Sequence, residues 1–184
     1  HGIDAVCFEK GSGIGGNWRY QNDNGMSAAY RSLHINTSRD LMAYSDFPMP
    51  DDYPDYPHHS QILAYFEAYA DHFDLRPHIR FNTGVARVEP LPEGGYAVTT
   101  EEGKRATYAQ VLVANGHHWS PRWPTPPFPG SFDGQVLHSH DYLIPEPYAG
   151  KRVVVLGIGN SAVDIACELA RQGGETYLAT RSGA

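Results

Sequence analysis

The sequence predicts an α/β fold of three layers, in which helices cover both faces of a mainly parallel sheet, with a small antiparallel β meander added. Three features predict it. Apolar runs typical of buried parallel strands alternate with helical segments, and one run leads directly into a glycine-rich loop at residues 157–162. Short alternating segments between turn residues occupy the middle of the chain.

Composition limits the function. The chain has 184 residues, of which 41% are apolar, and a formal net charge of −7. It lacks the Lys/Arg cluster of a nucleic-acid surface, and no run approaches the roughly eighteen apolar residues of a membrane-spanning helix. Cys7 and Cys167 lie among apolar neighbours, which predicts buried thiols in a reducing compartment. We expect a cytoplasmic protein that acts on small molecules, and the sequence leaves a homodimer open.

The first predicted strand runs from Ile3 to Glu9 and is expected to be buried and parallel. Glu9 stands at its carboxyl end, where an acid can accept hydrogen bonds from an adenosine ribose. Residues 11–16 match the spacing of a dinucleotide-binding glycine loop, but residues 17–25 lack the apolar period of a helix. Because a pyrophosphate needs the field of a helix N-terminus, we expect a plain glycine-rich loop here.

Residues 26–59 show little periodicity and predict a long irregular segment, which their aromatic content should keep ordered. Ser60 is then expected to cap a helix that extends to about Phe73. The apolar side chains of this helix recur three and four residues apart, at Ile62, Leu63, Phe66, Tyr69, Ala70 and Phe73. We expect this face to belong to the core.

Three segments separated by turns predict the meander and a buried strand after it: Arg80 to Val88, Tyr96 to Thr100 and Ala106 to Ala114. Residues 121–129 contain five prolines. This density predicts a stiff extended crossing between domains.

The strongest local signal begins at Val153. Val153–Leu156 is apolar on both faces, as expected for a central parallel strand covered by helices on both sides. Gly157 permits a tight turn, Gly159 lets the backbone approach a pyrophosphate, and Ala162 allows the helix to pack closely on the strand. A strand before the glycines and a helix after them predict a dinucleotide-binding loop.

The predicted helix runs from Ala162 to Arg171, with Asp164 in its first turn to complement the helix dipole. The next strand, residues 176–180, ends in Thr180 and Arg181. An NAD enzyme places an acid at this point, whereas the planar fork of an arginine can pair with a 2′-phosphate. We therefore predict NADPH; the alternative is an arginine that is merely solvated on a loop.

A longer motif precedes this unit, with fixed residues at Phe132, Gly134, His138 and Tyr142. It resembles the identifying sequence of the flavin-containing monooxygenase family, which lies just ahead of that family's NADPH loop. The interval to Gly157 and the continuation through Asn160, Ser161 and residues 164–166 are similar to the family as well. We expect a conformational or NADPH-domain role for His138 and Tyr142; purely structural hydrogen bonding is the alternative.

Other matches extend the resemblance over nearly the whole chain. Gly15, Gly16 and Trp18 resemble the family's flavin-side loop, and residues 33–48 resemble its next signature. Within that signature, Asn36 matches the asparagine that lies beside the reactive carbon of the flavin in the family. Taken without the resemblance, Asn36 is better interpreted as satisfying a buried loop carbonyl.

The resemblance implies a Rossmann-like flavoprotein with two dinucleotide-binding domains. Residues 1–125 would form part of the FAD-binding domain and residues 126–184 the start of the NADPH-binding domain. The chain starts at His1 and stops shortly after a predicted strand, so we expect a fragment, truncated at both ends and inactive alone. The residues expected to contact FAD or NADPH are Glu9, Gly15, Gly16, Trp18, Gly157, Gly159, Asn160, Ser161, Ala162, Thr180 and Arg181.

The implied reaction is a monooxygenation. In the family, NADPH reduces FAD, oxygen adds to the reduced flavin as a hydroperoxide, and an amine nitrogen or sulfide sulfur attacks its distal oxygen. By resemblance, Asn36 would hydrogen-bond near this centre, and a side-chain amide can donate there without losing a proton. The partners would be a small amine or sulfide and molecular oxygen.

Other functions are compatible with the sequence. A related motif ending in Trp marks enzymes that insert oxygen into ketones, whereas this one ends in Tyr142-Leu143. A disulfide oxidoreductase would need a redox pair of cysteines, which this sequence lacks. A non-catalytic NADP-binding module is the alternative of another class. No metal site is expected, because adjacent histidines on an extended segment point to opposite faces.

Overall fold

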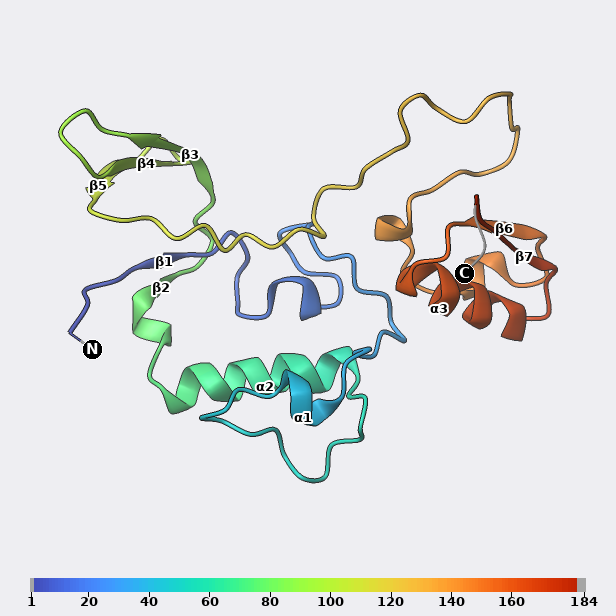
Figure 1. The fold of residues 1–184 in the computed structure, drawn as a ribbon, viewed down its shortest axis with the longest axis horizontal. Helices are drawn as coiled ribbons and strands as arrows, with labels where there is room; N and C mark the ends of the chain where they lie inside the picture. The colour runs from blue at the N-terminus through green and yellow to red at the C-terminus, as the bar shows by residue number, and fades with distance from the viewer. Residues whose placement is uncertain (1, 182–184) are drawn as a thin grey trace.

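The computed structural model describes residues 2–181 (Figure 1). One part of the ribbon holds helix α2 (His59–His72) and a three-stranded meander. Another part holds a strand–helix–strand unit built on α3 (Asn160–Arg171), and a long irregular crossing joins the two (Figure 1). The α/β class predicted from the sequence is confirmed.

The first strand is shorter and more exposed than predicted. Strand β1 (Cys7–Phe8) pairs in parallel with β2 (Ile79–Arg80), so the parallel direction is confirmed. The predicted burial of this strand is wrong, because Cys7 is exposed and Ile3, which is 80% exposed, lies outside the strand. Within the part of the chain that the structure describes, β2 is the one strand that pairs with β1, so most of the apolar run has no neighbour.

The glycine-rich segment 11–16 is a loop, as predicted. It ends in a single 3₁₀ turn, η1 (Gly16–Trp18), where a dinucleotide site would continue into an α-helix. Gly15 has a φ of +118°, which only glycine adopts without strain, and Gly16 has a φ of +50°.

Residues 26–58 are largely irregular, as predicted, apart from the short helix α1 (Arg39–Met42). Order comes from aromatic and apolar side chains that this segment packs against α2. The buried members of this cluster are Ile35, Met49, Ile62 and Tyr65. The predicted core face of α2 is confirmed at Ile62 and Ala70, whereas Phe73 follows the helix and is 38% exposed.

The cap of α2 differs from the prediction. His58, and not Ser60, is the N-cap residue. The His58 ring accepts a hydrogen bond from the Ser60 backbone N–H at 3.3 Å, and the Gln61 side chain accepts one from the His58 N–H at 3.0 Å. This reciprocal arrangement satisfies the backbone N–H groups of His58 and Ser60 at the start of the helix.

The meander is confirmed as an antiparallel sheet in the order β3-β4-β5, formed by β3 (Val85–Pro90), β4 (Tyr96–Thr100) and β5 (Arg105–Tyr108). Two boundaries differ. The first run is divided, because the 3₁₀ turn η2 (Arg76–His78) leads into β2, and residues 81–84 then turn towards β3. The segment predicted from Ala106 to Ala114 is a strand only in its first part, because β5 ends at Tyr108, and its predicted burial is wrong, because Leu112 is 93% exposed.

A long exposed stretch follows, and Figure 1 shows it crossing from the meander to the α3 unit. Two 3₁₀ turns, η3 (Ser139–Asp141) and η4 (Glu146–Tyr148), end the crossing. They bring the chain to the start of β6 (Val153–Leu156).

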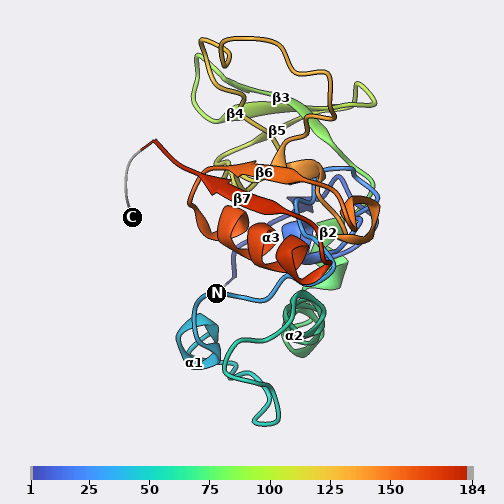
Figure 2. The same cartoon turned by 90° about the vertical axis from the view of Figure 1, so that its right-hand side faces the viewer.

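The α3 unit has the predicted order. β6 and β7 (Thr176–Ala179) pair in parallel, with Val153 opposite Thr176, and α3 connects them. The helix begins at Asn160, two residues before the predicted start, with Gly159 as its N-cap. Covering of both strand faces is not seen: α3 lies on one face (Figure 2), and Val154 on the other is 56% exposed.

Both cysteines are exposed, so the prediction of buried thiols is wrong. Cys7 lies on the uncovered two-residue ladder of β1. Cys167 lies on α3, whose buried residues are Ile165 and Leu169. Cys167 is two positions from both of these residues, so its side chain points away from the core face of the helix. Although Cys7 is exposed, partial desolvation of its thiol raises the pKa of that group, and the charge of Glu9 adds to that effect.

Candidate functional site

The loop between β6 and α3 has the geometry of a nucleotide loop. Gly157 has φ of +127°, and its N–H donates to the Ala179 carbonyl at 2.8 Å, so the chain turns sharply at the end of β6. A Cβ on Gly157 would come within 3.8 Å of the Ala162 Cβ. This is ordinary van der Waals distance, so a small residue at position 162 suits a helix that starts close to the turn.

The start of α3 leaves its backbone donors free of side-chain caps within the described residues. Gly159 is extended, with φ of −70° and ψ of 171°, and a Cβ there would meet no described atom within 4 Å. The next residues, Asn160 and Ser161, are exposed. Unpaired N–H groups and the positive end of the helix dipole are what a pyrophosphate requires, so these residues fit that group.

Thr180 and Arg181 follow β7 directly and are exposed. They lie at the carboxyl edge of the β6–β7 pair, the same edge at which Gly157 turns the chain. The acid of this strand, Glu175, precedes β7 and accepts a hydrogen bond from the Tyr177 hydroxyl at 3.2 Å. The charge at the carboxyl end of β7 is therefore the arginine cation, which fits a 2′-phosphate.

Asp164 does not have the predicted position. Because α3 begins at Asn160, Asp164 is the fifth helical residue and lies beyond the first turn. Its Oδ2 atom accepts a hydrogen bond of 2.5 Å from the Tyr30 hydroxyl. The carboxylate therefore joins the helix to the irregular segment 26–36 instead of balancing the helix dipole.

The four residues of the 132–142 motif differ in their contacts. Phe132 is 73% exposed, and its ring occupies the space that a Cβ on Gly134 would need. The His138 ring is the N-cap of η3 and accepts from the His140 N–H at 3.1 Å. Tyr142 is 3% exposed, and its hydroxyl donates to Glu168 Oε2 on α3 at 2.6 Å.

The predicted flavin-side loop packs on α2. A Cβ on Gly15 would overlap the end of the Leu63 side chain, and the φ of +118° at Gly15 would strain any other residue. Trp18 is partly buried against the α2 cluster, and its N–H donates to the Gly15 carbonyl at 2.8 Å. Glu9, at the end of β1, accepts a hydrogen bond of 2.6 Å from the Gly11 N–H through one oxygen.

Asn36 is exposed and lies between the buried Ile35 and Ser38, the N-cap of α1. Its side chain makes no hydrogen bond with any described residue, so it does not satisfy a buried loop carbonyl. The neighbours hold it in place: the Ile35 N–H donates to the Pro57 carbonyl at 3.0 Å.

The structure thus brings together the loop 157–162 and Arg181, and it joins segment 26–36 to α3. Figure 1 shows the loop 11–18 apart from α3, so the predicted contacts of Glu9 and Trp18 form a separate group. Sequence reasoning missed Tyr30 and Glu168. The spacing of Asp164 and Glu168, four residues apart on a predicted helix, was the available signal. Tyr30 lies in a segment without periodicity and offered none.

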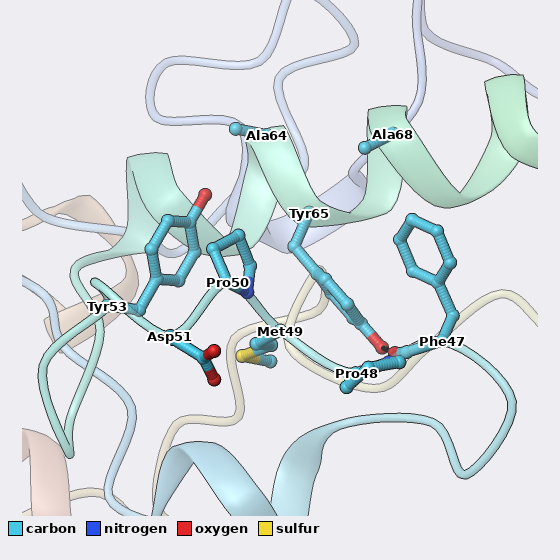
Figure 3. Close-up of a pocket in the computed structure, with 9 residues that line it drawn as sticks. All are labelled: Phe47, Pro48, Met49, Pro50, Asp51, Tyr53, Ala64, Tyr65 and Ala68. Carbon is cyan, nitrogen blue, oxygen red and sulfur yellow. Dashed lines mark hydrogen bonds between the residues drawn. The ribbon is translucent and has the colours of Figure 1, made fainter.

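A hollow of about 330 Å³ opens beside α2. Figure 3 shows Ala64, Tyr65 and Ala68 on the helix, facing residues 47–53. Asp51 is its one charged side chain, so the hollow does not fit a phosphate-bearing cofactor. Its full lining is Phe47, Pro48, Met49, Pro50, Asp51, Tyr53, Ala64, Tyr65 and Ala68.

Histidines come closer together than the sequence predicted. The rings of His58 and His59 are 4.1 Å apart between centroids, and those of His117 and His118 are 4.0 Å apart. Among residues 2–181, no three His, Cys, Asp or Glu side chains are grouped in a way that could hold a metal ion. In the same residues, no helix has the length and apolar character needed to cross a membrane.

These elements define the class: an α/β protein with a strand, glycine turn and uncapped helix of the Rossmann-like, dinucleotide-binding kind. A family model described as flavin-binding monooxygenase-like matches residues 1–184. The chain belongs to this family.

Two curated relatives illustrate the match. Flavin-containing monooxygenase 5 of Oryctolagus cuniculus is 46% identical over 194 aligned positions, which cover 100% of this chain and 36% of the relative. Dimethylaniline monooxygenase (N-oxide-forming) 2 of Rattus norvegicus is 40% identical, over 99% of this chain and 36% of the relative. The chain therefore spans about a third of the length of these relatives.

Solved structures agree in fold. S-allyl-L-cysteine S-oxygenase from Allium sativum has a TM-score of 0.85 and 30% identity over 97% of this chain and 46% of its own. Cyclohexanone monooxygenase from Rhodococcus sp. Phi1, bound to NADP⁺, has a TM-score of 0.69 and 29% identity over 95% of this chain and 32% of its own. The Rossmann-like flavoprotein fold predicted from the sequence is confirmed.

Proposed function

We propose that the protein is an NADPH- and FAD-dependent monooxygenase that oxygenates soft nucleophiles, an amine nitrogen or a sulfide sulfur. The observation that carries the proposal is the loop 157–162: its left-handed Gly157 and its uncapped helix start fit a dinucleotide, in a chain of this family. The similar proteins include one named for N-oxide formation and one named for S-oxygenation.

Two groups of residues would bind two different parts of NADPH. The N–H groups of Asn160, Ser161 and Ala162 would hold the NADPH pyrophosphate, and Arg181, beside Thr180, would pair with the 2′-phosphate. We propose that residues 126–184 begin the NADPH-binding domain.

For FAD, the Glu9 carboxylate would accept hydrogen bonds from the ribose through the oxygen that is not hydrogen-bonded to the Gly11 N–H. Gly15, Gly16 and Trp18 would shape the flavin side of residues 1–125, which we propose as part of the FAD-binding domain. Once bound, the two cofactors would supply the hydride and oxygen chemistry that protein side chains lack.

Asn36 is the proposed catalytic residue. Its side-chain amide is exposed and uncommitted within the described residues, so it is free to donate a hydrogen bond to the reacting oxygen. An amide does this at any pH without giving up a proton. Two residues of similar size could not do the same at this position. An aspartate would repel the developing negative charge, and a leucine would offer no hydrogen-bond donor.

The test uses the complete gene product. Purified protein should be yellow with bound flavin and should consume NADPH and oxygen faster when an amine or a sulfide is added. Asn36→Leu should retain flavin and NADPH binding but lose most product formation. Absence of flavin would overturn the proposal, and NADP binding without flavin would support the non-catalytic module instead.

Ketone oxygenation is the second candidate, because a cyclohexanone monooxygenase shares the fold. The lower TM-score of that structure and the Tyr142-Leu143 ending of the motif favour the heteroatom reaction. Including a cyclic ketone in the same assay separates the two, since a ketone enzyme would form a lactone.

We also propose a reducing, cytoplasmic location, which two exposed and unpaired cysteines suit. A homodimer is proposed as the oligomeric state to test. Cell fractionation and light scattering of the complete gene product address these two points.

A further inference from the structure

Two tyrosine hydroxyls bind two carboxylates on α3. Tyr30 donates to Asp164 at 2.5 Å and Tyr142 donates to Glu168 at 2.6 Å. Asp164 and Glu168 are four residues apart and so lie on one face of the helix. The two tyrosine rings are 4% and 3% exposed and meet edge to face, 6.0 Å between centroids. Segments 134 and 26 residues away in sequence are thereby joined to the helix that begins at the nucleotide loop.

The hydroxyls are suited to permanent donation. Burial raises the pKa of both Tyr30 and Tyr142 far above the ordinary tyrosine value, and the adjacent carboxylates act in the same direction. Each phenol therefore stays protonated across the neutral range. A hydrogen bond to a charged partner contributes more than one between neutral groups.

From Tyr30 the chain runs directly to Asn36, and it is held along the way. The Arg31 N–H donates to the Leu143 carbonyl at 2.9 Å, and the Arg31 carbonyl contacts a His58 ring nitrogen at 2.7 Å. The Leu33 carbonyl accepts from the His59 N–H at 2.8 Å. Segment 30–36 is therefore fixed to the start of α2 on one side, and on the other side Tyr30 fixes it to α3.

We propose that Tyr30 is a positioning residue that couples the nucleotide loop to Asn36 through its hydrogen bond to Asp164. Asp164 is one turn beyond Asn160, so a nucleotide bound at the first turn of α3 stiffens the helix where Tyr30 is attached. Segment 30–36 then becomes more ordered when the nucleotide is present. This inference rests on the proposed function, because it requires NADP⁺ to bind at residues 157–162.

Hydrogen–deuterium exchange of the complete gene product tests the coupling. NADP⁺ should slow amide exchange in peptides covering residues 30–36 by on the order of tenfold, the effect of one charge-assisted hydrogen bond. Tyr30→Phe keeps the buried ring and removes the hydroxyl, so it should abolish this slowing while the loop 157–162 is still protected. Tyr148→Phe is the matched control, because Tyr148 stacks on Tyr142 and its hydroxyl has no partner among residues 2–181.

Reciprocal variants keep the test valid if Tyr30→Phe does not fold. Asp164→Ala removes the acceptor and should likewise abolish the slowing at residues 30–36. Asp164→Asn retains an acceptor oxygen and should restore part of it. A general loss of structure would instead accelerate exchange throughout and also abolish the NADP⁺ protection of the loop 157–162, which loss of the Tyr30 coupling alone leaves in place.

The outcomes separate the two proposals. If NADP⁺ protects neither the loop 157–162 nor residues 30–36 in the parent protein, the nucleotide site itself is overturned. If NADP⁺ protects both regions equally in the parent, in Tyr30→Phe and in Asp164→Ala, nucleotide binding stands and the coupling through Tyr30 is overturned.

Discussion

Tyr142, the last fixed residue of the 132–142 motif, donates a 2.6 Å hydrogen bond to Glu168, two turns into α3. The bond explains why a motif that precedes the nucleotide loop belongs with it. Tyr142 also packs in the core cluster with Ile165 and Leu169, so both its ring and its hydroxyl hold the helix. The structural role considered for this tyrosine is therefore present in the fold, while an effect on NADPH binding remains a prediction.

Tyr142→Phe should destabilise the α3 unit. The change removes a hydrogen bond to a carboxylate and leaves Glu168 without its partner, which costs about 2 kcal/mol. We expect a lower midpoint of thermal unfolding, with flavin content unchanged. Tyr148→Phe, in the neighbouring ring, should stay close to the parent protein. Equal midpoints for both variants would show that the Tyr142 hydroxyl adds nothing to stability.

Alanine substitutions of the two glycines of the nucleotide loop should have different effects, one on stability and the other on nucleotide binding. Gly157 has φ of +127°, so Gly157→Ala strains the backbone by about 1–3 kcal/mol and should lower thermal stability. Gly159 has φ of −70°, and a Cβ there meets no described atom, so Gly159→Ala should fold normally. Its added methyl group would occupy the approach of the pyrophosphate and weaken NADP⁺ in a titration. A Gly159→Ala variant with full affinity would place the phosphate elsewhere.

Arg181→Ala should change nucleotide preference. Loss of one charge-assisted contact to the 2′-phosphate predicts roughly a tenfold to hundredfold weaker Kd for NADPH, while NADH binding stays nearly constant. Arg152→Ala is the control, because Arg152 precedes β6 at the opposite edge of the strand pair. Equal weakening of both nucleotides by Arg181→Ala would contradict a 2′-phosphate contact.

The elements that could be predicted from the sequence are those set by local chemistry. The β6–loop–α3–β7 unit follows from a strand, a left-handed glycine and a helical period within some thirty residues, and helix α2 follows from its apolar spacing. The meander follows from turn residues.

Burial was less predictable, because it depends on what covers an element. Val154, Cys7 and Leu112 are apolar residues in apolar runs, yet all three are exposed among the described residues. Periodicity indicates which side chains could be buried, but a neighbouring layer is needed to bury them.

The Tyr30–Asp164 contact could not be predicted at all, since 134 residues separate its partners and one of them lies in an irregular segment. The candidate site shows the same division. The spacing indicated Gly157, Gly159 and Arg181 as a group, whereas the fixing of Asn36 depends on long-range bonds.

His59 should make stability depend on pH. Its side chain is 6% exposed, its Nδ1 atom has no partner among the described residues, and its ring lies against that of His58. Burial, and then the charge of His58, lowers the pKa of His59 in the folded protein below its ordinary value of 6.5. As the pH falls through 6.5, the unfolded chain binds this proton before the folded chain does, so the free energy of unfolding decreases.

His59→Gln should remove this contribution, because the amide resembles the neutral ring in size and does not titrate. Midpoints of thermal unfolding between about pH 7.5 and pH 5.5 should fall less steeply in His59→Gln than in the parent protein. His78→Gln, at an exposed position in η2, is the control and should keep the parent's slope. If His59→Gln keeps that slope while remaining folded, the proton is taken up elsewhere, and the neutral state of the buried His59 ring does not contribute to stability near neutral pH.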